Sequence, residues 1–484
     1  MRAWIASTGC ALLAVNAGCL HEMSPARVAP GAPAAPGVRW VAPPGLVAAP
    51  SPAPRPEIPA DLIDSAQHMG LANLVDLALR DSPRTREAWA QARSAAAALG
   101  ASKGAYYPTV GLQLDRTTSK TSALGGAFSF FRNSYGSNAT LTWVLLDWGG
   151  RSASIEMARQ ALIAADWTHN AVMQDVVLDV EKAYYNYLNT RALLESRTAS
   201  VKEAQANLDA ASRRREAGVG TIGEVLQSKT ALSQAQLDLQ TTEGQIQTIK
   251  GALATAVGLP ANTRYEIEAP AEEFPVGEFT EEVDRLIEQA AAKRPDLAAA
   301  RARAAEAEAR IGSIRSTGLP SLVTNWGAGV TYYDQIGSSN SSTVETYNGA
   351  LLLRVPVFNG FSLQYDLMRV RSDAEAARAR VDELSQEIIS QVWSGFYDLR
   401  TATQRIETTR DLLDSAQQSY DVSLGRYKAG VGSILDLITS QASLDKARAQ
   451  QAQARTDWHL SLAQLAHDTG TLGVLSEPDK EGTP

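Results

Sequence analysis

Apolar and polar positions alternate strictly in four stretches of the chain. In the first, Val110, Leu112 and Leu114 alternate with polar residues, and three later stretches repeat the pattern. The apolar positions of these three are Tyr135, Ala139, Leu141, Trp143 and Leu145; Leu322, Trp326, Ala328, Val330 and Tyr332; and Tyr347, Leu351, Leu353, Val355 and Val357. A period of two over about ten residues is typical of membrane strands with one side toward lipid. We predict two β-hairpins, at residues 108–147 and 320–358.

Outside the hairpins the period changes to that of α-helices. Residues 149–217 and 361–429 contain no proline, and as helices each would be on the order of 100 Å long. Helices over 221–257 and 433–469 follow them, and shorter helices precede each hairpin. The two following helices carry a mostly apolar residue at every seventh position: Val225, Leu232, Leu239, Ile246 and Leu253, then Leu437, Leu444, Gln451, Trp458 and Leu465. Mostly small residues follow three positions later, which predicts close, left-handed coiled-coil packing.

The chain also repeats itself at a constant spacing. The stretches Ala217–Glu224 (AGVGTIGE) and Ala429–Asp436 (AGVGSILD) are copies separated by 429 − 217 = 212 residues, and the same shift relates Pro83 to Pro295. A constant register over such a distance indicates a duplicated unit. The predicted units are a first repeat over 61–270, a second repeat over 271–471 and a tail over 472–484.

Each copied stretch has the residues of a tight turn between two helices. Gly218 and Gly430 occupy the position after a helix that favours a left-handed residue. Thr221 with Glu224, and Ser433 with Asp436, have the spacing of a capping box that begins the next helix. The tip turns are therefore predicted at 217–224 and 429–436.

The N-terminus has the pattern of an export signal. Arg2 precedes an apolar run, and the only cysteines of the chain are Cys10 and Cys19. Ala17 and Gly18 before Cys19 resemble the processing site of bacterial lipoproteins, so we expect a signal over 1–19 and acylation of Cys19, with cleavage at another small residue as the alternative. A Pro/Ala-rich tether over 20–60 follows.

Composition narrows the function classes. The net charge of −8 gives no electrostatic support for a nucleic-acid partner. The five histidines have no metal-ligand spacing, and no nucleophile and base fall into a catalytic pattern, so we expect no metal, no cofactor and no enzyme activity. Gly218, Gly220 and Gly223 match a dinucleotide-site spacing, but the strand that such a site requires is missing. Beyond the start no apolar run is long enough for a spanning helix, so membrane crossing would use strands.

Four strands are too few to close a barrel, so several chains must contribute to one. From Leu71 to Thr469 the chain resembles the TolC-like outer-membrane efflux factors. The resemblance is carried by the duplicated element order and by Leu146–Arg151 (LDWGGR), Val355–Gly360 (VPVFNG) and Arg426–Gly432 (RYKAGVG). It implies a mainly α protein with a membrane β-barrel portion: a homotrimer with a barrel of 12 strands, four from each copy, and a helical tunnel. The signal and Cys19 are similar to the lipoprotein branch that serves resistance, nodulation and division pumps.

The resemblance also implies partners and site residues. The partners would be a periplasmic adaptor, an inner-membrane pump and the lipid of the outer membrane of a Gram-negative bacterium. The adaptor would dock on the tip turns, at Gly218, Val219, Gly220, Thr221, Gly430, Val431, Gly432 and Ser433. A periplasmic gate would involve Glu224, Tyr427 and Asp436, although helix capping is a competing role for both acids.

Two other functions remain open at this point. One is the outer-membrane duct of a type I protein secretion system. The other is a periplasmic coiled-coil scaffold or adaptor that forms no channel. The alternating strands favour a channel over a scaffold, because a scaffold needs no apolar face toward lipid.

Overall fold

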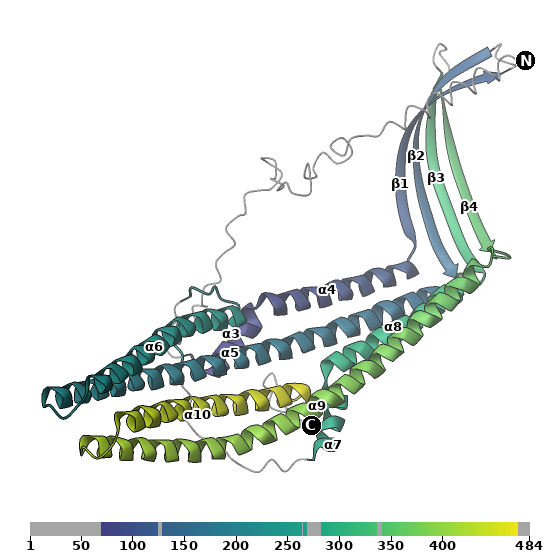
Figure 1. Ribbon diagram of the computed structural model, residues 1–484. Helices are drawn as coiled ribbons and strands as arrows, with labels where there is room; N and C mark the ends of the chain where they lie inside the picture. Colours follow the sequence, from purple (N-terminus) through teal and green to yellow (C-terminus); the bar gives the residue numbers. More distant parts are fainter. Residues whose placement is uncertain (1–68, 124–127, 264, 269–281, 336–340, 473–484) are drawn as a thin grey trace, which may run out of the picture. The chain divides into compact units, whose positions relative to one another are not determined.

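The computed structural model describes residues 69–472 except 124–127, 264, 269–281 and 336–340. The predicted signal, Cys19, the tether and the tail from residue 473 lie outside the described residues. Within them, the two halves of the chain have the same element order (Figure 1).

Each repeat consists of two short helices, a β-hairpin, a long helix and a returning helix. The first contains α3 (Leu71–Asp81), α4 (Pro83–Lys103), the 3-10 turn η3 (Gly104–Tyr106), β1 (Thr109–Ala123), β2 (Phe128–Leu146), α5 (Gly150–Glu216) and α6 (Ile222–Val257). The second contains α7 (Val283–Lys293), α8 (Pro295–Ser316), β3 (Ser321–Gln335), β4 (Ser341–Arg354), α9 (Ser362–Lys428) and α10 (Ile434–Asp468). The long helices α5 and α9 each have 67 residues. The proline-free runs are thus unbroken helices, as predicted.

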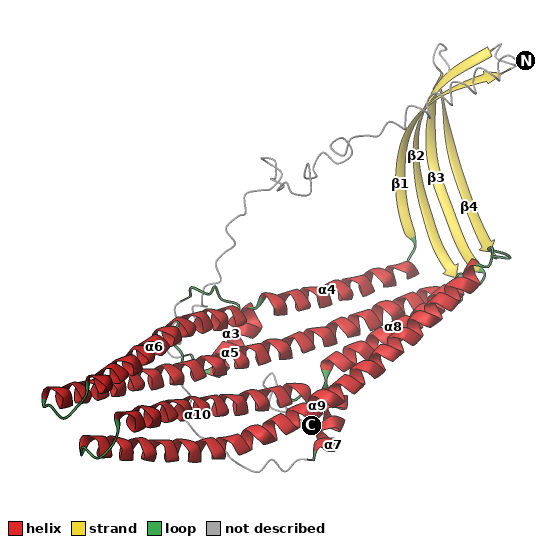
Figure 2. Ribbon diagram, viewed as in Figure 1, coloured by secondary structure: helices red, strands yellow, loops and turns green. Residues whose placement is uncertain are grey.

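The four strands form one antiparallel sheet in the order β1-β2-β3-β4 (Figure 2). Its register aligns Val110 with Leu141, Leu141 with Trp326 and Trp326 with Gly349, so the apolar positions share one face. The side chains on this face are exposed in the described part of the chain, with Val110 at 74% and Leu351 at 65% exposure. The predicted alternation is therefore confirmed, and it gives the sheet one apolar and one polar face.

The last strand is shorter than the sequence pattern indicated. We predicted that Val355 and Val357 continue the apolar face of the second hairpin, but β4 ends at Arg354. Pro356 has no N–H to donate to a neighbouring strand, which explains the end of the ladder. Val357, which directly follows Pro356, lies outside the strand and is 91% exposed.

The returning helices pack along the long ones, α6 against α5 and α10 against α9 (Figure 1). The heptad positions form the contact: Leu253, Leu437 and Leu444 are fully buried. The small positions beside them are buried as well, with Ser228 at 1% and Ala454 at 0% exposure. Small residues there let the helix backbones approach closely, which agrees with the predicted coiled-coil packing.

The helices of the two repeats meet where α5 packs against α8 and α10, and the contact with α10 includes a series of polar pairs. The side chain of Asn207 donates to Gln441 over 2.8 Å, and that of Asn189 donates to Gln453 over 2.9 Å. The hydroxyl of Ser200 donates to Asp445. Arg448 pairs with Glu203 in the same region. We refer to these contacts as the polar seam.

None of the helices within the described ranges has a stretch that is apolar enough to cross a membrane.

Candidate functional site

The two tip turns have the same backbone conformation. Gly218 and Gly430 have φ of 77° and 78°, the left-handed conformation that glycine adopts without strain. In the first turn the N–H of Val219 donates to the carbonyl of Arg214 over 3.0 Å, and the equivalent bond closes the second turn. These bonds satisfy the last carbonyls of α5 and α9, so the turns are built as the sequence predicted.

The next glycine of each turn lies against the preceding helix. A Cβ on Gly220 would lie 2.9 Å from the backbone nitrogen of Arg215, and one on Gly432 would lie 2.8 Å from that of Tyr427. Any larger residue would therefore push the turn off the end of the helix. These two glycines determine the shape of the tips.

The residues after the glycines cap the returning helices. The hydroxyl of Thr221 accepts a hydrogen bond from the N–H of Glu224 over 3.2 Å, and that of Ser433 accepts one from Leu435 over 3.0 Å. A full capping box also needs the acid to bond back to the N–H of the cap residue. No such bond from Glu224 or Asp436 is present in the described chain, so only half of the box forms.

The carboxylate of Glu224 instead joins a cluster that links the two repeats. The hydroxyl of Tyr427 lies 3.5 Å from Glu224 Oε2, the outer limit for a hydrogen bond. The guanidinium of Arg214 lies 4.0 Å from the same oxygen and 5.0 Å from the centroid of the Tyr427 ring. It also donates to the backbone carbonyl of Tyr427 over 3.4 Å. We call Arg214, Glu224 and Tyr427 the tip cluster.

The environment of the tip cluster keeps Tyr427 neutral. Its side chain is 1% exposed, and this burial raises the pKa of its hydroxyl above the ordinary value. The negative charge of Glu224 raises the pKa further, while Arg214 opposes the shift. The hydroxyl is therefore a hydrogen-bond donor to the Glu224 carboxylate at neutral pH, while Arg214 approaches that carboxylate only as an ion pair at 4.0 Å.

The third predicted gate residue is not part of this cluster. Asp436 is exposed in the first turn of α10. In the described part of the chain, no hydrogen bond or ion pair joins it to Glu224, Tyr427 or Arg214. A negative charge at that position is stabilised by the positive, N-terminal end of the α10 dipole. The structure thus brings together two of the three predicted residues.

The tips expose large apolar side chains. Val219 is 66% exposed and Val431 is 71% exposed. They are joined by Ile222, Leu226 and Leu435, each more than half exposed. Apolar side chains grouped on an exposed turn are typical of surfaces that bind another protein.

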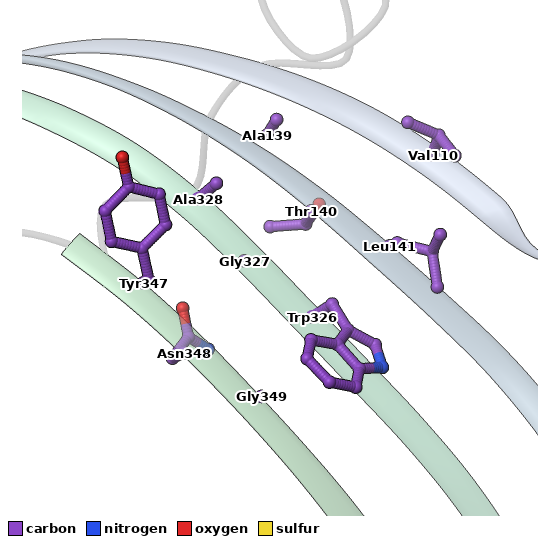
Figure 3. Close-up of a pocket in the computed structure, with 10 residues that line it drawn as sticks. All are labelled: Val110, Ala139, Thr140, Leu141, Trp326, Gly327, Ala328, Tyr347, Asn348 and Gly349. Carbon is purple, nitrogen blue, oxygen red and sulfur yellow. The ribbon is translucent and has the colours of Figure 1, made fainter. Parts of the chain in front are cut away.

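The apolar face of the sheet has a shallow hollow of about 450 Å³ (Figure 3). Trp326 and Tyr347 stand beside it, and small residues such as Ala139, Ala328 and Gly349 form its floor. Its lining contains no acid, base or thiol. Within the described ranges no group of three or more His, Cys, Asp or Glu residues is placed to hold a metal ion. The hollow therefore presents mostly apolar surface.

The duplicated hairpin sheet and helical hairpins agree with the comparisons with known proteins. A family model described as "Outer membrane efflux protein" matches residues 74–259 and 286–471. The chain belongs to this family. The two matched segments are offset by 286 − 74 = 212 residues, which is also the spacing of the two tip turns.

Relatives within the family match most of the chain. Protein CyaE of Bordetella pertussis is 29% identical over 452 residues, 93% of this chain and 91% of the relative. The pyoverdine export outer membrane protein OpmQ of Pseudomonas putida is 27% identical over 69% of this chain and 68% of the relative. Among solved structures, the CmeC outer membrane channel of Campylobacter jejuni has a TM-score of 0.73 at 16% identity, covering 84% of this chain and 87% of CmeC. The shared fold is that of outer-membrane efflux channels, and this chain is one of them.

Sequence reasoning missed Arg214 as a site residue. A signal was present, because Ser200, Asn207 and Arg214 recur every seven residues on α5. All three contact the second repeat, Ser200 and Asn207 on α10 and Arg214 at Tyr427 on α9. Polar residues at heptad spacing on a long helix therefore indicated a polar contact with a neighbour.

Proposed function

We propose that three copies of this chain form the exit duct of a tripartite efflux system. Their strands close one barrel in the outer membrane, and their helices form a tunnel that extends into the periplasm. The tunnel passively conducts cargo that an inner-membrane pump delivers through a periplasmic adaptor. The family supports the outer-membrane channel, and the open sheet of the single chain supports the assembly.

The observation that carries this proposal is the incomplete sheet. Within the described residues β1 and β4 each pair on one side only, and the apolar face of the sheet is exposed. In a membrane, each unpaired backbone group at a strand edge raises the free energy by roughly several kcal/mol. The edges of the sheet must therefore be paired. Three copies supply 3 × 4 = 12 strands, an even number within the range of closed barrels.

The test is a conductance measurement on protein extracted from the outer membrane. The purified protein should migrate as a trimer before heating and as a monomer after heating. In planar lipid bilayers it should give stepwise currents. A monomer in the soluble periplasmic fraction, or bilayers that stay sealed, would overturn the channel.

A pair of neighbouring substitutions tests the assignment of the faces. Leu112→Arg places a charge on the apolar face, where the cost near the bilayer midplane is about 2–4 kcal/mol, and should prevent insertion. Gln113→Arg, one residue away on the polar face, is the matched control and should insert and conduct. Equal insertion of both variants would contradict the assignment.

Adaptor docking on the tips is supported by their exposed apolar residues. The proposed docking surface is Gly218, Val219, Gly220, Thr221, Gly430, Val431, Gly432 and Ser433. Of these, Val219 and Val431 offer the largest apolar side chains, while Gly220 and Gly432 determine the shape that presents them.

A gate at the tip end of the tunnel is supported by the tip cluster. Tyr427 and Arg214 tie the end of α9 to the beginning of α6 through Glu224. Breaking these contacts would free the two helical hairpins to move apart. Asp436 is outside the tip cluster. Its proposed part in the gate is electrostatic: its negative charge would face the lumen of the tunnel.

The lipid anchor is proposed from the sequence. Mature protein that begins at an acylated Cys19 would be held to the membrane by this residue as well as by its strands. Mass spectrometry of the mature N-terminus tests this, and an unmodified terminus beyond residue 19 would refute it.

A further inference from the structure

The two edges of the sheet carry opposite charges on the apolar face. On the β1 edge, Arg116 and Lys120 continue the row of Val110, Leu112 and Leu114. On the β4 edge, Glu345 lies in the row of Tyr347 and Leu351: it pairs with Val330, just as Tyr347 pairs with Ala328. Lys120 and Glu345 lie in the halves of β1 and β4 next to the hairpin turns, and Arg116 is at the middle of β1.

Among the described residues of their own copy, these charges have no partner of opposite charge. The guanidinium of Arg116 lies 5.5 Å from the centroid of the Tyr135 ring, and the ammonium of Lys120 lies 5.0 Å from that of Phe131. Glu345 accepts a long hydrogen bond of 3.4 Å from Tyr347. In the described part of the chain, none of the three forms an ion pair. Two further acids lie on the described strands: Asp115 on the polar face of β1, and Asp334 on β3, which is paired with Ser341 and thus one strand in from the β4 edge.

The lengths of the edge strands restrict how two copies pair. β1 has 15 residues and β4 has 14, and the two strands run in opposite directions. Because lipid leaves no backbone group unpaired, the overlap of β4 with β1 of the next copy must be as long as possible. The apolar faces must also coincide, and a slip by one residue would turn every side chain of β4 to the wrong face.

One register meets both requirements. It places Arg354 opposite Thr109 and Ser341 opposite Ser122, so all 14 residues of β4 are paired. In this register the residues on the apolar face of β4, which have odd numbers, lie opposite those on the apolar face of β1, which have even numbers. The apolar faces of the two strands therefore coincide. A shift by two residues in either direction keeps the faces but shortens the overlap. In this register Glu345 lies opposite Thr118.

We propose, on the basis of the trimer described above, that Glu345 of one copy lies between Arg116 and Lys120 of the next. Both cations are diagonal neighbours of Glu345, two residues from the directly opposed Thr118, and long side chains reach across such diagonals. The mixed cluster gives each of these charges an opposite charge nearby and reduces the net charge of the three groups to +1. It also penalises other registers, because they would separate Glu345 from one or both cations.

Cysteine cross-linking in full-length, membrane-inserted protein tests the register. Thr118→Cys with Glu345→Cys should give covalent dimers and trimers on oxidation, seen on denaturing gels without reductant. Leu114→Cys with Glu345→Cys is the matched control, four residues along the same face, and should give at least about fivefold less product because strands rise about 3.4 Å per residue. Each single-cysteine variant controls for Cys19.

The outcomes separate this inference from the proposed function. An intact trimer in which the Leu114 pair cross-links better than the Thr118 pair, or in which neither cross-links, overturns the register and leaves the channel standing. A chain that is monomeric in the membrane overturns both.

Charge exchange tests the ion cluster by itself. Glu345→Lys should lower the temperature at which the trimer dissociates, because it places three cations together. Adding Lys120→Glu and Arg116→Glu to it should restore more than half of the loss. If the cations instead served lipid phosphates, Arg116→Gln with Lys120→Gln would destabilise the trimer only in anionic lipid while Glu345→Gln had no effect, and this result would overturn the cluster.

Discussion

The returning helices α6 and α10 begin with nearly the same turn, yet their first turns differ in burial. In α10, Ile434 and Leu437 are 5% and 0% exposed. In α6, the equivalent of Ile434 is Ile222, which is 52% exposed, and the equivalent of Leu437 is Val225, which is half-buried. The reason is their neighbours, because α10 packs against both α9 and α5, whereas α6 packs mainly against α5. A duplicated motif thus determines the turn, while the surrounding helices decide which copy becomes core and which remains a surface.

The largest expected effect contrasts Leu437 with Leu226, which is 55% exposed and follows the equivalent of Leu437 in α6 by one residue. Leu437→Ala should lower the free energy of unfolding by about 2–5 kcal/mol, because it opens a cavity in a closed core. Leu226→Ala should change it by no more than about 0.5 kcal/mol, because its side chain is exposed in the single chain. Urea denaturation followed by helical circular dichroism measures both. A comparable loss for the two variants would mean that α6 is as closely packed as α10.

The next effect concerns export. Val219→Asp with Val431→Asp should lower export about tenfold or more, since burying an unpaired carboxylate in an apolar contact costs at least about 1.4 kcal/mol. Each single variant then shows which tip contributes more to docking. Adaptor co-purification and cargo efflux are the measurements.

The docking experiment has a conservative control. Val219→Thr with Val431→Thr keeps the size of the side chains and should retain most of the export. Heat-modifiable trimers must form in every variant. Full export by the aspartate variants in the presence of intact trimers would exclude docking at these tips.

The contact of α10 with α5 also predicts a pH dependence. His467 on α10 lies 3.0 Å from both Asp175 on α5 and Asp468. Burial lowers the pKa of the imidazole, but hydrogen bonds to the two carboxylates outweigh it and raise the pKa to about 9. The raised pKa means that His467 stabilises the fold fully below about pH 6.5, its unfolded value, and that this stabilisation is lost as the pH rises toward 9.

The measurement is the melting temperature between pH 6 and pH 10. It should fall across this range in the natural protein and fall less in His467→Gln, which keeps a polar side chain but cannot be charged. Equal slopes for the two proteins would show that this contact does not tie α10 to α5.

The smallest expected effect is at the tip cluster. Tyr427→Phe removes the long hydrogen bond to Glu224, a contact of about 1 kcal/mol, and should raise the open fraction of the channel about fivefold. Single-channel recording measures it. Asp436→Ala is the comparison variant, because Asp436 is exposed on α10. It should alter the ion preference of the channel and leave its open fraction unchanged. An effect of Asp436→Ala on opening larger than that of Tyr427→Phe would assign the gate to the acid alone.

The sequence was sufficient to predict features that follow from local periodicity. Val110, Leu112 and Leu114 alternate because one face of a strand meets lipid, and Leu437 and Leu444 recur because one side of a helix meets another. The predicted end of β4 was wrong, because the alternation of apolar residues continues through Pro356 whereas the hydrogen bonding between the strands ends before it. Arg214 was missed because its heptad spacing with Ser200 and Asn207 indicates a polar contact but does not identify the partner, and Tyr427 is 213 positions away in the chain.

The two free edges of the sheet also have a consequence for biogenesis. A newly exported copy has two edge strands with unpaired backbone groups, which can pair with the edge strand of any other chain. It is therefore prone to aggregation until two further copies bind to it. Assembly is then the last step of folding rather than an event after it. The yield of functional protein should depend steeply on how many chains reach the envelope together, and surplus single copies should be removed by proteases.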